Sequence, residues 1–261
     1  MKKHTQKSSG IFVLLGFIAA VMIATGTVWS VLNTQLNTIS STPITLAAPT
    51  ASTETVSTAT KNVASPSPTT SLTPLLPDSF QLSIPFTVQA PFAVWDALHE
   101  DTCEEASFLM VKYSLDGTPI PPKDQVDTQL KTMVDWETQH GYGGSITLSQ
   151  LQDIAAQEYG ITTGQVTKNI TIDDIKQQIT AGHSVILGMA GKLLDNPYFS
   201  NGGPNYHALV VTGYDATGFI TNDPGSRQGE NFHYTYTNFY NAIHDWDATN
   251  ILNGSKDMLV F

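Results

Sequence analysis

The sequence predicts an α+β fold for residues 78–261. Segments with helical periodicity come first, between residues 103 and 181, and short runs rich in β-branched residues follow between residues 184 and 222. Helices followed by strands, rather than an alternation of the two, are typical of α+β domains, in which helices pack on an antiparallel sheet. A stretch of about 180 residues is also long enough to build one sizeable hydrophobic core.

Four helices are predicted from the spacing of apolar side chains and from the residues at their ends. Thr147 and Gln150 have the spacing of a capping box at the start of the third helix, and Thr102 and Glu105 have the same spacing at the start of the first. A glycine follows each segment, as is common after the last turn of a helix. The predicted helices span 103–116, 123–140, 148–159 and 172–181.

The strands are predicted from short β-branched runs bounded by Gly, Asn and Pro. An extended segment, Gln81–Val88, contains Pro85, which favours an edge position because proline has no N–H to donate. The remaining predicted elements are strands at 184–189, 207–214, 219–222 and 258–261, and a last helix at 238–246.

The first 77 residues have a different composition. Residues 1–10 carry three lysines and no acid, and residues 11–32 are uncharged and long enough to span a bilayer as a helix. The positive-inside rule then predicts a cytoplasmic segment at 1–10, a transmembrane anchor at 11–32 and a domain outside the cytoplasm. Residues 33–77 read as a disordered Ser/Thr/Pro-rich linker. A cleaved signal peptide, which would make the domain a secreted protein, stays open as the alternative.

Charge and motif content narrow the possible partners of the domain. Residues 78–261 contain 8 Lys and Arg and 22 Asp and Glu, a formal net charge of −14. We therefore expect no nucleic-acid partner, because phosphate binding needs clustered cations, although solubility alone also explains the acidity. We expect no metal, because there is no second cysteine and no His-Glu-x-x-His motif, and no cofactor, because no Gly-rich phosphate loop is present.

Cys103 is the only cysteine of the chain and therefore forms no internal disulfide. If Thr102 is the N-cap, Cys103 is the first residue of a helix, where unpaired N–H groups and the helix dipole lower a thiol pKa. The carboxylates of Glu104 and Glu105 act in the opposite direction. A reactive thiol at this position consequently needs a cationic partner such as a protonated histidine.

Among seven histidines, His207 has the most suggestive surroundings. It opens the strand HALVVTGYD directly after a loop rich in Gly, Asn and Pro, and the next strand ends in Asn222-Asp223-Pro224-Gly225. Two adjacent antiparallel strands would hold an imidazole and a carboxylate on neighbouring rungs, as an orienting hydrogen bond requires.

Four features follow one another along the chain: a glutamine in an extended segment, a cysteine that opens a helix, HALVVTGYD and NDPG. This ordered set resembles the papain-like cysteine peptidases that process double-glycine bacteriocin leaders. It resembles above all their stand-alone relatives on bacterial surfaces. The resemblance covers roughly residues 84–245 and implies a papain-like fold. It also implies roles for four residues: Cys103 as nucleophile, His207 as general base and acid, Asp223 as the group that orients His207, and Gln89 as an oxyanion donor. This chain has two glutamates after the cysteine, where the family often has small residues.

The function predicted from these observations is an exported cysteine peptidase or amidase that acts on a peptide or protein substrate and is attached to the membrane by its N-terminal helix. Two alternatives stay open. The same residues could transfer an acyl group to an amine, as a transglutaminase does, or the cleft could bind peptides or cell-wall components without catalysis. A thiol pKa well below about 8.5 would favour an enzyme, and an unreactive thiol would favour the binding module.

Overall fold

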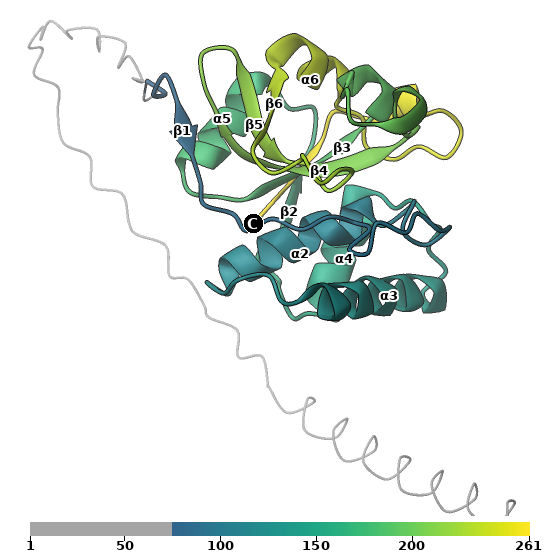
Figure 1. Cartoon of the computed structure of the whole chain (residues 1–261). Coiled ribbons are helices and arrows are strands. Elements are labelled where there is room, and N and C mark those ends of the chain that lie inside the picture. Colours follow the sequence, from purple (N-terminus) through teal and green to yellow (C-terminus); the bar gives the residue numbers. More distant parts are fainter. Residues whose placement is uncertain (1–74) are drawn as a thin grey trace, which may run out of the picture. The chain divides into compact units, whose positions relative to one another are not determined.

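A computed structural model describes residues 75–261 of the chain (Figure 1). The predicted cytoplasmic segment, the predicted membrane anchor and nearly all of the predicted linker lie outside these residues. Between residues 75 and 261 there is no helix long and apolar enough to cross a membrane. The elements run in the order β1 (Phe80–Gln81), α2 (Cys103–Leu115), α3 (Lys123–Gln139), α4 (Leu148–Gln157), β2 (Gln165–Thr167), α5 (Ile172–Thr180), β3 (Val185–Met189), η1 (Gly191–Leu194), η2 (Ser200–Gly202), β4 (His207–Tyr214), β5 (Gly218–Asn222), β6 (Phe232–Thr235), α6 (Tyr236–Ala242), η3 (Ile251–Asn253) and β7 (Met258–Val260).

The strands form one antiparallel sheet in the order β2-β7-β3-β4-β5-β6. The short β1 pairs with the far end of β4, beyond the stretch that β3 occupies. All eight residues of β4 and all five of β3 are buried, which makes this pair the centre of the sheet. The predicted α+β class with an antiparallel sheet is therefore confirmed.

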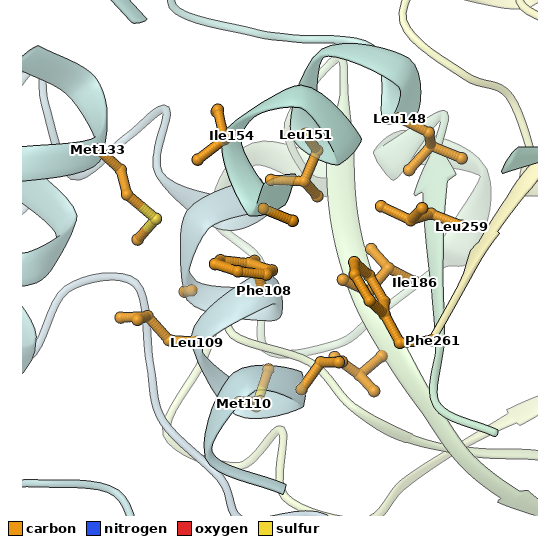
Figure 2. Close-up of a cluster of buried hydrophobic side chains, with 14 of the residues drawn as sticks. Phe108, Leu109, Met110, Met133, Leu148, Leu151, Ile154, Ile186, Leu259 and Phe261 are labelled. Carbon is orange, nitrogen blue, oxygen red and sulfur yellow. The ribbon is translucent and has the colours of Figure 1, made fainter. Parts of the chain in front are cut away.

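Helices cover both faces of the sheet (Figure 1). Helices α2, α3 and α4 form one core with Ile186, Val210 and Leu259, and α5 and α6 form a second core with the alternate residues Leu187 and Leu209. This division follows from the two-residue period of a strand. Figure 2 shows the first core, in which side chains of α2 and α4 meet those of the sheet.

Helix α2 lies at the centre of the first core. Its first nine residues are all buried, and Phe108 contacts the rings of Tyr159 and Phe261. A helix enclosed on all sides needs apolar residues around its circumference, which the consecutive run Phe108–Val111 supplies. Truncation of Phe108 to alanine should cost about 3–5 kcal/mol of stability, the usual range for a buried aromatic side chain. The start of α2 is thus held firmly in place.

Most predicted elements are present, with ends shifted by a few residues. The capping box at Thr147 is confirmed, and a second one joins Thr171 and Asp174. The predicted extended segment 81–88 overlaps the two-residue strand β1 only at Gln81, and the last helix lies at 236–242 rather than 238–246. Strands β2 and β6 were not predicted, because they are short edge strands that lack the continuous apolar run of the equally short β7.

Candidate active site

His207 and Asp223 come together where β4 begins and β5 ends. Because the two strands pair antiparallel, with Val210 opposite Asn222, the first residue of β4 lies close to the residue that follows β5. The His207 Nε2 atom is 2.8 Å from Asp223 Oδ1, and both side chains are buried. The predicted pairing of these two residues is therefore present, and Nδ1 is the ring nitrogen left for another partner.

Asp223 is a fully partnered carboxylate. Its Oδ2 accepts hydrogen bonds from Tyr234 Oη at 2.5 Å and from Asn196 Nδ2 at 3.3 Å, and its Oδ1 also accepts one from the Gly225 N–H at 2.8 Å. Burial alone raises the pKa of Asp223, but the charge of His207 and the hydrogen bonds from His207, Tyr234 and Gly225 outweigh it and lower that pKa. The carboxylate thus stays ionised and keeps the imidazole oriented.

Gly225 explains why the NDPG turn ends in glycine. A Cβ atom at this position would lie 3.0 Å from His207 Cε1 and 3.1 Å from Asp223 Oδ1. Phe199, which packs edge-on against the His207 ring with centroids 5.2 Å apart, would also be crowded. The turn can therefore approach the His–Asp pair closely only with glycine there.

Cys103 is the first residue of α2, as predicted, but its surroundings differ from the expectation. Its side chain is 4% exposed, and its Sγ donates a 2.9 Å hydrogen bond to Glu104 Oε2. The other oxygen of Glu104 accepts the N–H of Ile146 at 3.0 Å. The predicted capping box is wrong: Thr102 Oγ1 donates to the Gln89 carbonyl at 3.3 Å, and the Glu105 carboxyl is buried without a hydrogen-bond partner.

Buried carboxyl groups dominate the electrostatics around the sulfur. Burial, then Glu104, then Glu105 raise the pKa of Cys103 well above its usual value, and only the backbone of Ala208 acts in the opposite direction. Burial also raises the pKa of Glu104 to about 8. The pKa of Glu105 is raised by burial and by the charges of Glu104 and Glu137. The thiol therefore rests in its neutral form, hydrogen-bonded to Glu104.

The backbone of Gln89 links the turn after Asp223 to the residue before Cys103. Its N–H donates to the carbonyl of Pro224 at 3.1 Å, and its own carbonyl accepts the hydroxyl of Thr102, the residue before Cys103. Its side-chain Nε2 donates to the carbonyls of His99 at 2.8 Å and Glu100 at 3.4 Å, and its Oε1 is buried without a partner. The amide hydrogens are thus directed at the backbone in this structure.

The four predicted residues converge on one end of the sheet without all being in contact. The His207 ring packs against Phe199, which belongs to the core on the side of β4 that carries Leu209, whereas α2 packs against the other side. The two groups meet at the start of β4, where the backbone of Ala208, the residue after His207, lies beside the Cys103 sulfur. Within residues 75–261 the sulfur's hydrogen bond goes to Glu104 and not to His207.

A cavity of about 650 Å³ opens at this end of the sheet. His207 and Gln89 both lie on its wall, together with side chains of the loop 198–206 and of the turn 225–228. Cys103 is not part of the wall, but Gln89, whose carbonyl accepts the hydroxyl of Thr102, is. The cavity therefore provides a binding cleft beside the His–Asp pair.

Comparison with known protein families shows to which family the chain belongs. Residues 81–251, about two thirds of the chain, match the model of the Peptidase_C39 like family. The chain belongs to this family. No curated protein sequence matches this C39-like chain. Among solved structures, a protein from Bacillus anthracis named as a C39-like peptidase is similar, with a TM-score of 0.48 and 15% sequence identity over 71% of this chain and 98% of that one.

Several residues around the C39-like site were not found from the sequence. Tyr234 and Asn196 bind Asp223 from an unpredicted strand and from an irregular loop, so periodicity gave no signal for them. His99 lies between two carboxylates, with Nδ1 2.7 Å from Asp96 and Nε2 2.9 Å from Asp127, and so attaches the Gln89–Cys103 loop to α3. In the described part of the chain, no cluster of three or more His, Cys, Asp or Glu side chains could hold a metal ion.

Proposed function

We propose that this C39-like domain is a cysteine peptidase or amidase that uses Cys103, His207 and Asp223. The observation that carries the proposal is the buried His207–Asp223 pair, in which Asp223 occupies Nε2 and leaves Nδ1 as the proton acceptor. Gln89 supports it, because its backbone joins the residue after Asp223 to the residue before Cys103. Membership of a peptidase-like family points in the same direction.

The proposed reaction is acyl transfer through a thioester. The Cys103 thiol gives its proton to His207 Nδ1, and the thiolate attacks the carbonyl carbon of the scissile amide. The Cys103 N–H and the Gln89 amide stabilise the oxyanion, His207 protonates the leaving amine, and water then hydrolyses the thioester. In this structure the side-chain Nε2 of Gln89 donates to the carbonyls of His99 at 2.8 Å and Glu100 at 3.4 Å, so the whole amide group has to rotate before it can donate to the oxyanion.

Glu104 sets the resting state of the proposed nucleophile. Its carboxyl accepts the thiol hydrogen bond and raises the thiol pKa. Formation of the thiolate therefore requires the sulfur to exchange Glu104 for His207 as its hydrogen-bond partner. We expect this exchange to accompany substrate binding in the cavity.

The same contact favours a second candidate, a cleft that binds peptides without cleaving them. A thiol that stays buried and neutral beside Glu104 would be inert, and the cavity would remain available for binding. Thiol reactivity separates the two functions.

We also propose that the domain acts outside the cytoplasm. The support is in the sequence: residues 11–32 are uncharged over the length of a membrane span, and lysines precede them. Protease protection of the tagged C-terminus in right-side-out and inverted membrane vesicles tests this proposal. Protection in right-side-out vesicles would contradict it.

Catalysis is tested by incubating the full-length protein with a synthetic peptide library and identifying the products by mass spectrometry. We expect cleavage by the wild-type protein and none by Cys103→Ala. Equal product formation by the two proteins would exclude Cys103 as the nucleophile. A complete absence of products, together with peptide binding, would favour the binding module.

A further inference from the structure

The turn that follows Asp223 brings a guanidinium group to the cavity. Arg227 is the only arginine of the chain and lies on the wall of the same cavity as His207. Its side chain is exposed, and within residues 75–261 it makes no ion pair. The other charged side chain on this wall is Glu100. The cavity next to the His–Asp pair therefore contains one unpaired cation.

The backbone of the turn is fixed relative to the His–Asp pair. The Asp223 N–H donates to the Gly229 carbonyl at 2.9 Å, and the Gly229 N–H donates to the Ser226 carbonyl at 3.2 Å. Ser226 Oγ also accepts the N–H of Gln228 at 3.2 Å. Arg227 thus lies in a closed turn that begins at Asp223, the residue that binds His207, and this turn places Arg227 on the wall of the same cavity as His207.

Aromatic side chains form another part of the cavity wall. Trp95 and Tyr198 line it and are 48% and 51% exposed, so their faces are available to a ligand. Phe199, the next residue along the chain, contacts the His207 ring. Exposed aromatic side chains bury large apolar area when a ligand covers them.

The charge of Arg227 and the net charge of the domain together determine which peptides the cleft can bind. A guanidinium binds carboxylates through two parallel N–H···O bonds, which gives it direction as well as strength. The domain has a formal net charge of −14, so it repels ligands with many negative charges. A ligand with one carboxylate near Arg227 and an apolar side chain near Trp95 satisfies both conditions.

We propose that the cleft selects peptides that carry a carboxylate within a few residues of the scissile bond, with Arg227 binding that carboxylate and with Trp95 and Tyr198 contacting a neighbouring apolar side chain. The assignment of a scissile bond rests on the proposed peptidase function. The recognition of the carboxylate does not, because it can be measured as binding alone.

The test uses full-length Cys103→Ala protein and synthetic octapeptides in matched pairs that differ only by Glu or Gln at one position. We expect the Glu member of the best-bound pairs to bind about tenfold more tightly, the effect of a charge-assisted hydrogen bond. Arg227→Gln in the same background should remove this preference. Lys192→Gln is the matched control, because it removes an exposed positive charge that does not line the cavity, and it should keep the preference.

Equal binding of Glu and Gln peptides, or a Glu preference that survives in the Arg227→Gln protein, would overturn the inference. Cleavage of the same peptides by the wild-type protein separates this result from the proposed function. A carboxylate preference in binding without any cleavage would contradict the peptidase and leave the recognition by Arg227 intact. Cleavage without a carboxylate preference would support the peptidase and contradict the recognition by Arg227.

Discussion

The two halves of the site differ in how completely their polar groups are satisfied. On the β4 side, His207 and Asp223 are buried, and each oxygen of Asp223 accepts hydrogen bonds. On the α2 side, Glu105 has no hydrogen-bond partner, and the Cys103 thiol shares Glu104. A preorganised His–Asp pair therefore lies at the same end of the sheet as a thiol that is held in its neutral form.

This difference shows where the activity of the domain can be controlled. A satisfied network keeps one geometry because each alternative costs a hydrogen bond. Buried carboxyl groups without partners instead raise one another's pKa and make the local charge depend on pH. We therefore expect the β4 half to set the maximal rate and the α2 half to set the conditions under which the thiolate forms.

The largest expected effect is on the β4 half. His207→Ala should lower kcat/KM by at least about 10³-fold, because it removes the general base and acid. The matched control is His233→Ala. His233 on β6 pairs with Asp215, in the turn between β4 and β5, at 3.2 Å, but this pair is solvent-exposed and does not line the cavity. Peptide hydrolysis should be unchanged in that variant, and an equal loss in both would mean that His207 acts only through stability.

Substitution of Glu104 tests the α2 half directly. Glu104→Gln removes the carboxylate that raises the pKa of Cys103. We therefore expect the thiol pKa to fall by about one unit, which makes the thiolate population about tenfold larger at any pH below that pKa. The measurement is the absorbance of the thiolate at 240 nm against pH, with Cys103→Ala as the blank. An unchanged or higher thiol pKa would contradict the role given to Glu104.

Tyr234→Phe should have a smaller effect on rate, about tenfold in kcat. It removes one hydrogen bond to Asp223 Oδ2, and because that bond lowers the pKa of Asp223, the pKa should rise. The acid limb of the pH–rate profile should therefore move to higher pH. Tyr240→Phe, which removes a hydroxyl bonded to the Ile170 carbonyl outside the site, is the control. A lower rate without a displaced acid limb would indicate a packing defect only.

The smallest effect concerns stability. The pKa values of Glu104, Glu105 and Glu137 are raised in the folded state, to about 8 for Glu104, so the folded protein binds more protons than the unfolded chain. The free energy of unfolding should consequently fall as pH rises from about 4.5 to 8. Glu105→Gln should reduce this fall by about 1 kcal/mol or more. Glu158→Gln, which replaces an exposed glutamate, should leave this fall unchanged. Urea unfolding at pH 5 and pH 8 measures both effects.

Much of the fold was predictable because its signals are local. Apolar periodicity and following glycines located α2 to α5, and the β-branched run of β4 gave that strand its observed ends. The strands β2 and β6 were missed because they lie at the edges of the sheet and lack the continuous apolar run that marks β7. Similarly, the extended segment after Gln81 lacks a ladder partner, which no local signal reveals.

The site was predictable where residue identity and strand order sufficed. His207 and Asp223 could be paired from the ends of two adjacent strands, and that contact is present. The partner of the Cys103 thiol was not predicted, because Glu105 was expected to cap the helix and Glu104 to face solvent. Both are buried by the packing of α2 against α4, Ile146 and the sheet, which depends on contacts distant in sequence.

The central claim, that His207 activates Cys103 once a peptide occupies the cavity, is tested most directly by the rate at which a peptidyl chloromethyl ketone, whose peptide part fills the cavity, alkylates Cys103 between pH 5 and pH 9. The lone cysteine makes mass spectrometry of the intact protein sufficient. If the two residues form a thiolate–imidazolium pair, wild-type protein will be alkylated at least tenfold faster at pH 6 than His207→Ala. Equal rates in the two proteins across this pH range would contradict the claim.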